Sequence, residues 1–157
     1  MSFLLPSQGK PRTMSDTVTN REPLILRGNM PVRVVRLGSA RSKGEGIRIG
    51  TVRLPPRGVP KAEFSSHDWY DVWFPTLAPS LETMKSAQKA TTAKQWAAFI
   101  RKYRAEMATP GNRHALALLA ALSHCTDFSV GCYCEDEAHC HRSVLRTLLM
   151  EHGAKIE

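Results

Sequence analysis

The sequence of 157 residues lacks any apolar run close to the roughly 20 residues that a membrane-spanning helix needs. The short apolar stretch at the N-terminus, Phe3 to Leu5, is stopped by Pro6, so we expect no export signal. Without export, the four cysteines are expected to stay reduced, which favours metal-bound, catalytic or buried thiols over disulfides. These absences predict a cytoplasmic protein with no membrane partner.

Blocks of consecutive Lys or Arg are also absent, although the net charge is +8. The excess lies in the first half of the chain. Residues 1–61 hold 12 Lys and Arg and three acidic residues, whereas residues 62–157 hold ten and 11. An excess of basic residues in one half of a chain is typical of proteins that bind a polyanion, but it also arises from a basic tail and a basic cleft edge. A nucleic acid therefore stays open as a partner beside an anionic small molecule.

Residues 1–30 lack hydrophobic periodicity and are rich in polar residues and proline, so we predict a disordered leader. Met14 and Met30 are alternatives to Met1 as the true start of the protein. The remaining residues, 31–157, are enough for one domain with its own core.

The folded part alternates β-branched runs with helical patterns. We predict strands at residues 32–37, 47–54 and 128–134, and helices beginning at Ser80 and lying at 93–107, 112–122 and 140–152. This order predicts a small α/β domain with a parallel, Rossmann-like sheet flanked by helices.

The densest group of reactive side chains follows the last predicted strand. Cys140, His141 and Arg142 open the C-terminal helix, and a helix N-terminus holds anions and stabilises thiolates. We therefore predict these three as catalytic residues, with a lowered pKa at Cys140, and His139 and Ser143 as ligand-binding neighbours. In the alternative the segment is structural: Cys140 packs beneath the loop, and Arg142 pairs with the acidic residues before it.

No glycine lies between Cys140 and Arg146, although this pair has the bare spacing of a cysteine phosphatase loop. That mechanism curls backbone amides around a phosphate, which usually requires glycines. The intervening residues have helix spacing instead, so we favour a helix over a phosphatase loop.

A basic turn follows the second predicted strand. Arg53 and Arg57 flank a double proline, and Lys61 follows them. If this strand and the last one are parallel neighbours, their carboxyl ends meet at one edge of the sheet, where α/β proteins bind ligands. We therefore predict that Arg53, Arg57 and Lys61 bind an anionic ligand, bearing phosphate or carboxylate, opposite Cys140. In the alternative these side chains are solvated or paired with carboxylates.

A zinc site is the alternative role for the cysteines. Cys132 and Cys134 point to the same face of a strand, and Cys140 with His139 or His141 completes a set of four ligands. The spacing matches no standard zinc finger, so our first expectation is that no cofactor binds.

Three blocks of the sequence resemble one known family. They are residues 46–61, which are similar to the family's strand ending in Arg-Leu-x-Pro-Arg-Gly-x-x-Lys, residues 71–106, and Cys132-x7-Cys140-His-Arg-Ser. They resemble the domain of unknown function 488, in its YeaO-like branch, over residues 32–152. Pro55 departs from the tryptophan common in that branch, and Cys134 is additional.

The family has no agreed activity, so the resemblance implies an uncharacterised protein. From the residues we expect an anionic ligand at the Cys-His-Arg helix start, with thiol-based catalysis as a further step. The alternatives are a nucleic-acid-associated protein and a non-catalytic, zinc-stabilised binding module.

Overall fold

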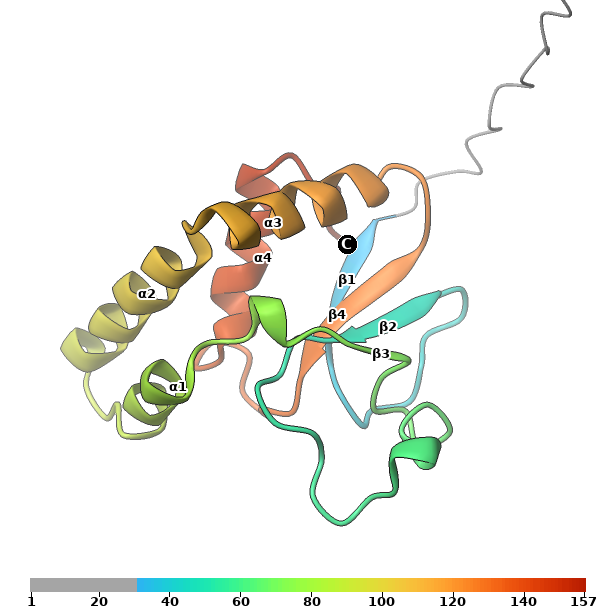
Figure 1. Ribbon diagram of the computed structural model, residues 1–157, viewed down its shortest axis with the longest axis horizontal. Helices are drawn as coiled ribbons and strands as arrows, with labels where there is room; N and C mark the ends of the chain where they lie inside the picture. Colours follow the sequence, from blue (N-terminus) through green and yellow to red (C-terminus); the bar gives the residue numbers. More distant parts are fainter. Residues whose placement is uncertain (1–30) are drawn as a thin grey trace, which may run out of the picture.

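The computed structural model describes residues 31–157, so the predicted leader and the alternative starts at Met14 and Met30 lie outside the described residues. The strands are β1 (Val32–Arg36), β2 (Ile47–Gly50), β3 (Val72–Trp73) and β4 (Phe128–Cys132) (Figure 1). The α-helices are α1 (Leu81–Gln88), α2 (Ala93–Met107), α3 (Pro110–Leu122) and α4 (His141–Glu151), with short 3₁₀ helices at Lys61–Glu63 and Pro75–Leu77. None of the helices in this part of the chain combines the length and apolar character needed to cross a bilayer.

The four strands form one sheet in the order β1-β4-β2-β3, and every pair is parallel. β4 lies in the middle, with Phe128 level with Val32 of β1 and with Ile47 of β2. The predicted α/β fold with a parallel sheet is confirmed. Parallel neighbours end at the same edge, so the carboxyl ends of β1, β4 and β2 lie together.

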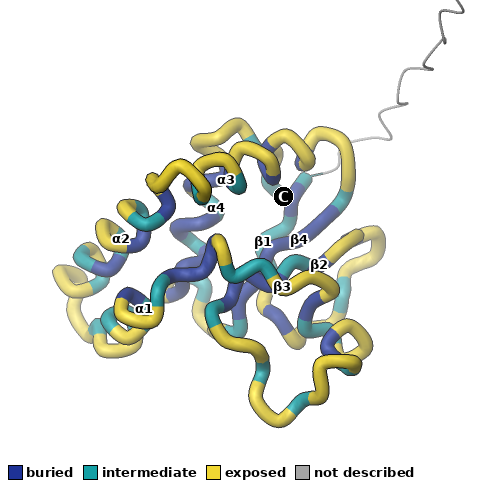
Figure 2. The backbone as a smooth tube through the Cα atoms, viewed as in Figure 1, coloured by how far each residue is buried: buried dark blue, intermediate teal, exposed yellow. Residues whose placement is uncertain are grey.

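The helices gather on one face of the sheet (Figure 1). Phe128 and Val130 point to this face, because side chains alternate along a strand, and they pack with Phe99 and Tyr103 of α2 and Leu145 of α4. All five residues of β4 are buried, so Figure 2 shows this strand dark along its length. This core fixes the helices against the central strand.

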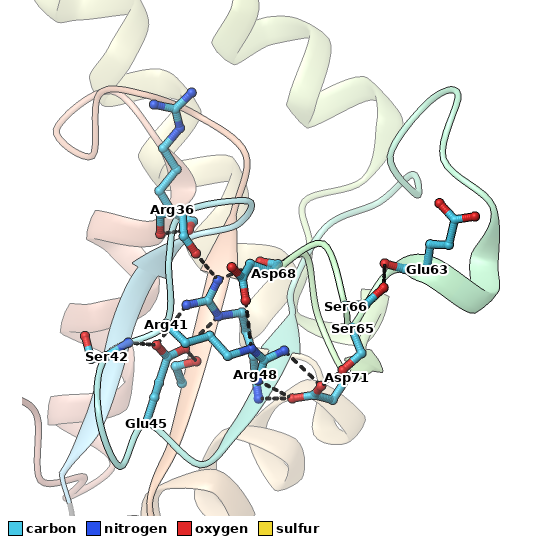
Figure 3. A network of polar contacts seen from close by, with 12 residues as sticks. Arg36, Arg41, Ser42, Glu45, Arg48, Glu63, Ser65, Ser66, Asp68 and Asp71 are labelled. Atoms are coloured by element: carbon cyan, nitrogen blue, oxygen red, sulfur yellow. Dashed lines mark hydrogen bonds and ion pairs between the residues drawn. The ribbon is translucent and has the colours of Figure 1, made fainter.

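The opposite face is closed by a buried ionic network (Figure 3). Arg48 is fully buried and donates from Nε and Nη2 to the two carboxylate oxygens of Glu45, at 2.6 and 2.8 Å. Its Nη1 donates to the backbone carbonyls of Ser39 and Asp68, at 2.7 and 2.6 Å. The hydroxyl of Ser129, in β4, donates to Glu45 at 2.7 Å. The network therefore ties the connections around residues 39–45 and 68 to the sheet.

Several predicted boundaries differ from the structure. β2 and β4 end at Gly50 and Cys132, so residues 51–54 and 133–134 extend beyond the sheet into loops. α3 begins at Pro110 instead of residue 112. Proline suits the first position of a helix, because the backbone N–H at that position has no acceptor within the helix and its loss costs nothing. The two-residue strand β3 was not predicted, since so short an edge strand leaves no periodicity.

Candidate functional site

A pocket of about 900 Å³ opens at the carboxyl edge of β1, β4 and β2. Three segments that follow these strands line it, residues 36–39, 52–57 and 132–135, together with residues 139–141 at the start of α4. The remaining lining side chains are Trp69, Pro79, Met84, Ala87, Gln88 and Phe99. The parallel pairing thus brings the basic turn and the Cys-His-Arg segment to one pocket.

Three arginines and the exposed His139 line this pocket, and their side chains have different partners. Arg57 is exposed, and within residues 31–157 it makes no hydrogen bond or ion pair. Arg53 donates from Nε to the carbonyl of Pro79 and from Nη2 to that of Ala78, at 2.9 and 2.7 Å. Arg36 pairs with exposed Glu135 in the loop after β4, and Nδ1 of His139 lies within hydrogen-bond distance of exposed Asp136. The side chain of Arg57 is therefore free to bind a ligand, whereas Arg53 stabilises the backbone of the pocket wall just before α1.

At the inner end of the pocket, Cys132, Cys140 and His141 form a buried group whose ligand atoms all lie within 4.8 Å of one another. Cys140 is the N-cap of α4, and its Sγ accepts the backbone N–H of Arg142 at 3.5 Å. The Sγ of Cys140 lies 3.8 Å from Nδ1 of His141. Two thiol sulfurs and one imidazole nitrogen therefore lie close together, a set of atoms that can bind a soft metal or take part in thiol chemistry.

The ring of His141 is fixed from both sides. Its Nε2 lies 2.8 Å from the carbonyl oxygen of Thr51, which can only accept, so Nε2 carries the proton. Tyr103 packs against the ring edge-to-face, with ring centroids 5.6 Å apart. Burial lowers the pKa of His141 to about 4, so the ring is neutral near pH 7. A neutral ring protonated on Nε2 leaves its lone pair on Nδ1, facing the sulfurs.

The pKa values of the three neighbouring thiols, Cys132, Cys134 and Cys140, are shifted in different directions. Sγ of Cys132 and Sγ of Cys134 are 3.7 Å apart. Hydrogen bonds from Cys132 and Cys140 lower the pKa of Cys134 well below its usual range. A hydrogen bond with Cys132 lowers the pKa of Cys140, but its bond to Cys134 and its burial outweigh this and raise it. The lowered pKa that the sequence predicts for Cys140 is therefore wrong, and the pKa is lowered at Cys134 instead.

Three predicted site residues lie outside the pocket lining. Arg142 is buried, and its Nη2 donates to the carbonyl of Cys134 at 2.8 Å, so it supports the loop that carries the thiols. Ser143 donates to the carbonyl of Cys140 at 2.9 Å, within the first turn of α4. Lys61 is exposed at the start of the first 3₁₀ helix.

Sequence reasoning missed other lining residues. Arg36 ends β1, so the same argument about strand ends that selected Arg53 applies to it once β1 is known to be a neighbour of β4. Trp69 and Tyr133 form an edge-to-face pair in the wall, 5.5 Å between centroids. No sequence signal distinguished these two rings from the core aromatics.

A comparison with protein families supports the predicted resemblance. A family model described as the active DUF488-N3 subclade matches residues 32–153, which is nearly the whole described domain. No curated protein and no solved structure matches the chain. The match spans both strand ends and the Cys-His-Arg segment that form the pocket, and the chain belongs to the DUF488 family, in the active DUF488-N3 subclade.

Proposed function

We propose that the pocket at the carboxyl edge of the sheet binds an anionic small molecule that bears a phosphate or a carboxylate. One observation carries this proposal: arginines from two different strand ends and the N-terminus of α4 meet at a single pocket. A helix N-terminus and guanidinium groups both favour negative charge. The volume of about 900 Å³ lies within the range of pockets that enclose small ligands.

The lining suggests how the ligand would lie. Arg57 would clamp the anionic group, since it is exposed and has no partner within the described residues. Trp69 and Tyr133 offer apolar surface for an uncharged body, such as a ring. Cys140 and His141 would face the reacting end of the ligand, and Arg142 would act as a positioning residue through the Cys134 carbonyl. The proposed ligand is therefore an anion with an apolar portion.

The clamp is tested by replacing Arg57 with alanine and measuring phenyl phosphate binding by calorimetry. A hydrogen bond to a charged group contributes about 1.5 kcal/mol or more, so the affinity is expected to fall about tenfold. The melting temperature should stay unchanged, because the side chain is exposed and makes no contact that stabilises the fold.

Lys61→Ala is the matched control, since it removes the same charge from an exposed side chain outside the pocket lining. Its affinity for phenyl phosphate should equal that of the wild type. Equal losses in the two variants would mean that general attraction to a basic surface causes the binding. No binding to the wild-type protein would refute the proposal.

A second candidate, a zinc-stabilised binding module, is favoured by the close grouping of Cys132, Cys140 and His141. In such a module metal binding adds to the folding free energy, so a chelator lowers the melting temperature. Phenyl phosphate binding distinguishes the two candidate functions, because a module that is only stabilised by zinc is not expected to bind phenyl phosphate.

A further inference from the structure

We propose that Sγ of Cys132, Sγ of Cys140 and Nδ1 of His141 bind one zinc ion at the inner end of the pocket, and that its fourth coordination position opens into the pocket. This inference deepens the proposed function, because the anionic ligand would supply the fourth donor. The binding of the metal itself does not depend on that function.

The distances suit a tetrahedral ion. Zinc binds thiolate sulfur at about 2.3 Å and imidazole nitrogen at about 2.0–2.1 Å, which places neighbouring donors of a tetrahedron about 3.5–3.8 Å apart. The Sγ of Cys140 and Nδ1 of His141 are 3.8 Å apart, and no pair in the group exceeds 4.8 Å. Adjustments of about 1 Å or less therefore complete the coordination geometry.

The surroundings of His141 have the arrangement expected around a metal-binding imidazole. Such a ring usually donates its other N–H to a carbonyl or carboxylate, which fixes its tautomer and orientation. Here Nε2 donates to the carbonyl of Thr51 at 2.8 Å. Thr51 is itself fixed, since its backbone N–H and its hydroxyl both donate to the carbonyl of Gly131, at 3.0 Å each. The ring is thus held with its lone pair toward the sulfurs.

Charge and donor type also favour zinc. Two thiolates neutralise a divalent cation, so the ion can occupy a place where all three ligand residues are buried. Soft sulfur donors with one imidazole select zinc over magnesium or calcium, which prefer oxygen. The chemistry of the three side chains therefore agrees with their geometry.

The placement of Cys134 leaves the fourth coordination position of the proposed ion to a ligand from the pocket. Its Sγ lies 3.7 Å from that of Cys132 and hydrogen-bonds with Cys140, but it does not belong to the group whose ligand atoms, including that of His141, all lie within 4.8 Å, and its residue is exposed. Zinc sites with three protein ligands leave one position for water or substrate. All three ligand residues line the pocket, so a phosphate or carboxylate oxygen held by Arg57 has access to this position.

The site is tested by cobalt(II) titration of the full chain, followed by its visible absorption, and by the zinc content of the purified protein. The wild type is expected to bind one equivalent and to show thiolate-to-cobalt charge transfer. Cys132→Ser and Cys140→Ser should each lose most of the affinity. Cys125→Ser, which changes an exposed cysteine after α3, should bind as the wild type does. No binding by the wild type, or an equal loss in Cys125→Ser, overturns the site.

The open position has its own tests. Cys134→Ser should retain the metal; if it loses the metal as fully as Cys132→Ser, the site is a closed set of four protein ligands and the inference is overturned. Because substitution of a buried cysteine can prevent folding, X-ray absorption of the zinc-loaded wild type provides an independent measurement. Two sulfur neighbours support the inference, and three overturn it.

Inorganic phosphate distinguishes this inference from the proposed function. Phosphate should shift the cobalt spectrum, and an unchanged spectrum at saturating phosphate overturns the open position. Phenyl phosphate binding after zinc removal reports on the arginine clamp alone. Metal binding without phenyl phosphate binding therefore refutes the proposed function, and the reverse result refutes the metal site.

Discussion

Replacing Arg48 with methionine is expected to lower the free energy of unfolding by about 3–5 kcal/mol, the usual cost of removing one partner from a buried ion pair. The guanidinium of Arg48 is fully buried, and its bonds to Glu45, Ser39 and Asp68 measure between 2.6 and 2.8 Å. Methionine fills similar space but leaves the Glu45 carboxylate without its cation. Urea unfolding of the full chain gives the change directly.

The control is the same substitution at the surface, Arg104→Met. Arg104 pairs with Glu151 at 2.7 Å, but both side chains are substantially exposed, so the expected loss is below about 1 kcal/mol. Comparable losses in the two variants would show that the Arg48 network contributes no more than a surface pair. The Arg48 network also bears on the pocket, because the carbonyl of Ser39 that Arg48 holds belongs to a lining residue.

The pH dependence gives a second measurement of the same network. Burial raises the pKa of Glu45, but hydrogen bonds from Arg48, Ser129 and Ser42 outweigh it and lower the pKa to about 2. A carboxylate with a depressed pKa stabilises the fold above its unfolded pKa, near 4.5, and this contribution is lost as the pH falls toward 2. The stability difference between the wild type and Arg48→Met should therefore shrink over this range. A difference that is constant with pH would contradict the assignment.

Gly46→Ala is expected to destabilise the protein by about 2–5 kcal/mol. Gly46 has φ +73°, where a side chain costs about 1–2 kcal/mol. A Cβ at this position would also lie 2.0 Å from the carbonyl oxygen of Asp127, and this is backbone that cannot move aside without disturbing β4. Overpacking of this kind adds about 1–3 kcal/mol.

Gly44 is a matched control in the same connection. It has a similar φ of +72°, but no atom lies within 4 Å of its Cβ position. Gly44→Ala should therefore show only the cost of the backbone conformation, and the difference between the two variants measures the clash. Thermal unfolding of both proteins provides this comparison. Equal melting temperatures would mean that residues 44–46 do not pack against β4 as described.

The sequence supported the parallel pairing and its consequence for the site. The β-branched runs at 32 and 47 and the apolar run at 128 became β1, β2 and β4, and their shared carboxyl edge brought Arg53 and Arg57 to the pocket that Cys140 also lines. Strand direction alone brings these residues to one edge, and the alternation of strands and helices indicates that direction. Strand direction does not determine which side chains are free to bind a ligand.

The contacts of single side chains were beyond prediction for a physical reason. Arg48 lies in a run that reads as an ordinary strand, and Glu45 lies in a stretch that reads as a flexible connection. Their partners Asp68 and Ser129 are 20 and 84 residues away from them. Arg142 was expected to contact a ligand or a carboxylate, whereas the structure directs it to the carbonyl of Cys134. Such bonds depend on tertiary placement, which spacing does not encode.

NMR chemical shifts show directly whether an anion binds in the pocket at the carboxyl edge of the sheet. Phenyl phosphate is titrated into the isotope-labelled full chain, and the backbone amide chemical shifts are followed by NMR. We expect saturable shifts in residues 36–39, 52–57 and 133–141, which surround the pocket, and smaller shifts elsewhere. Shifts scattered over the basic surface without these segments, or no shifts at all, would contradict binding in the pocket.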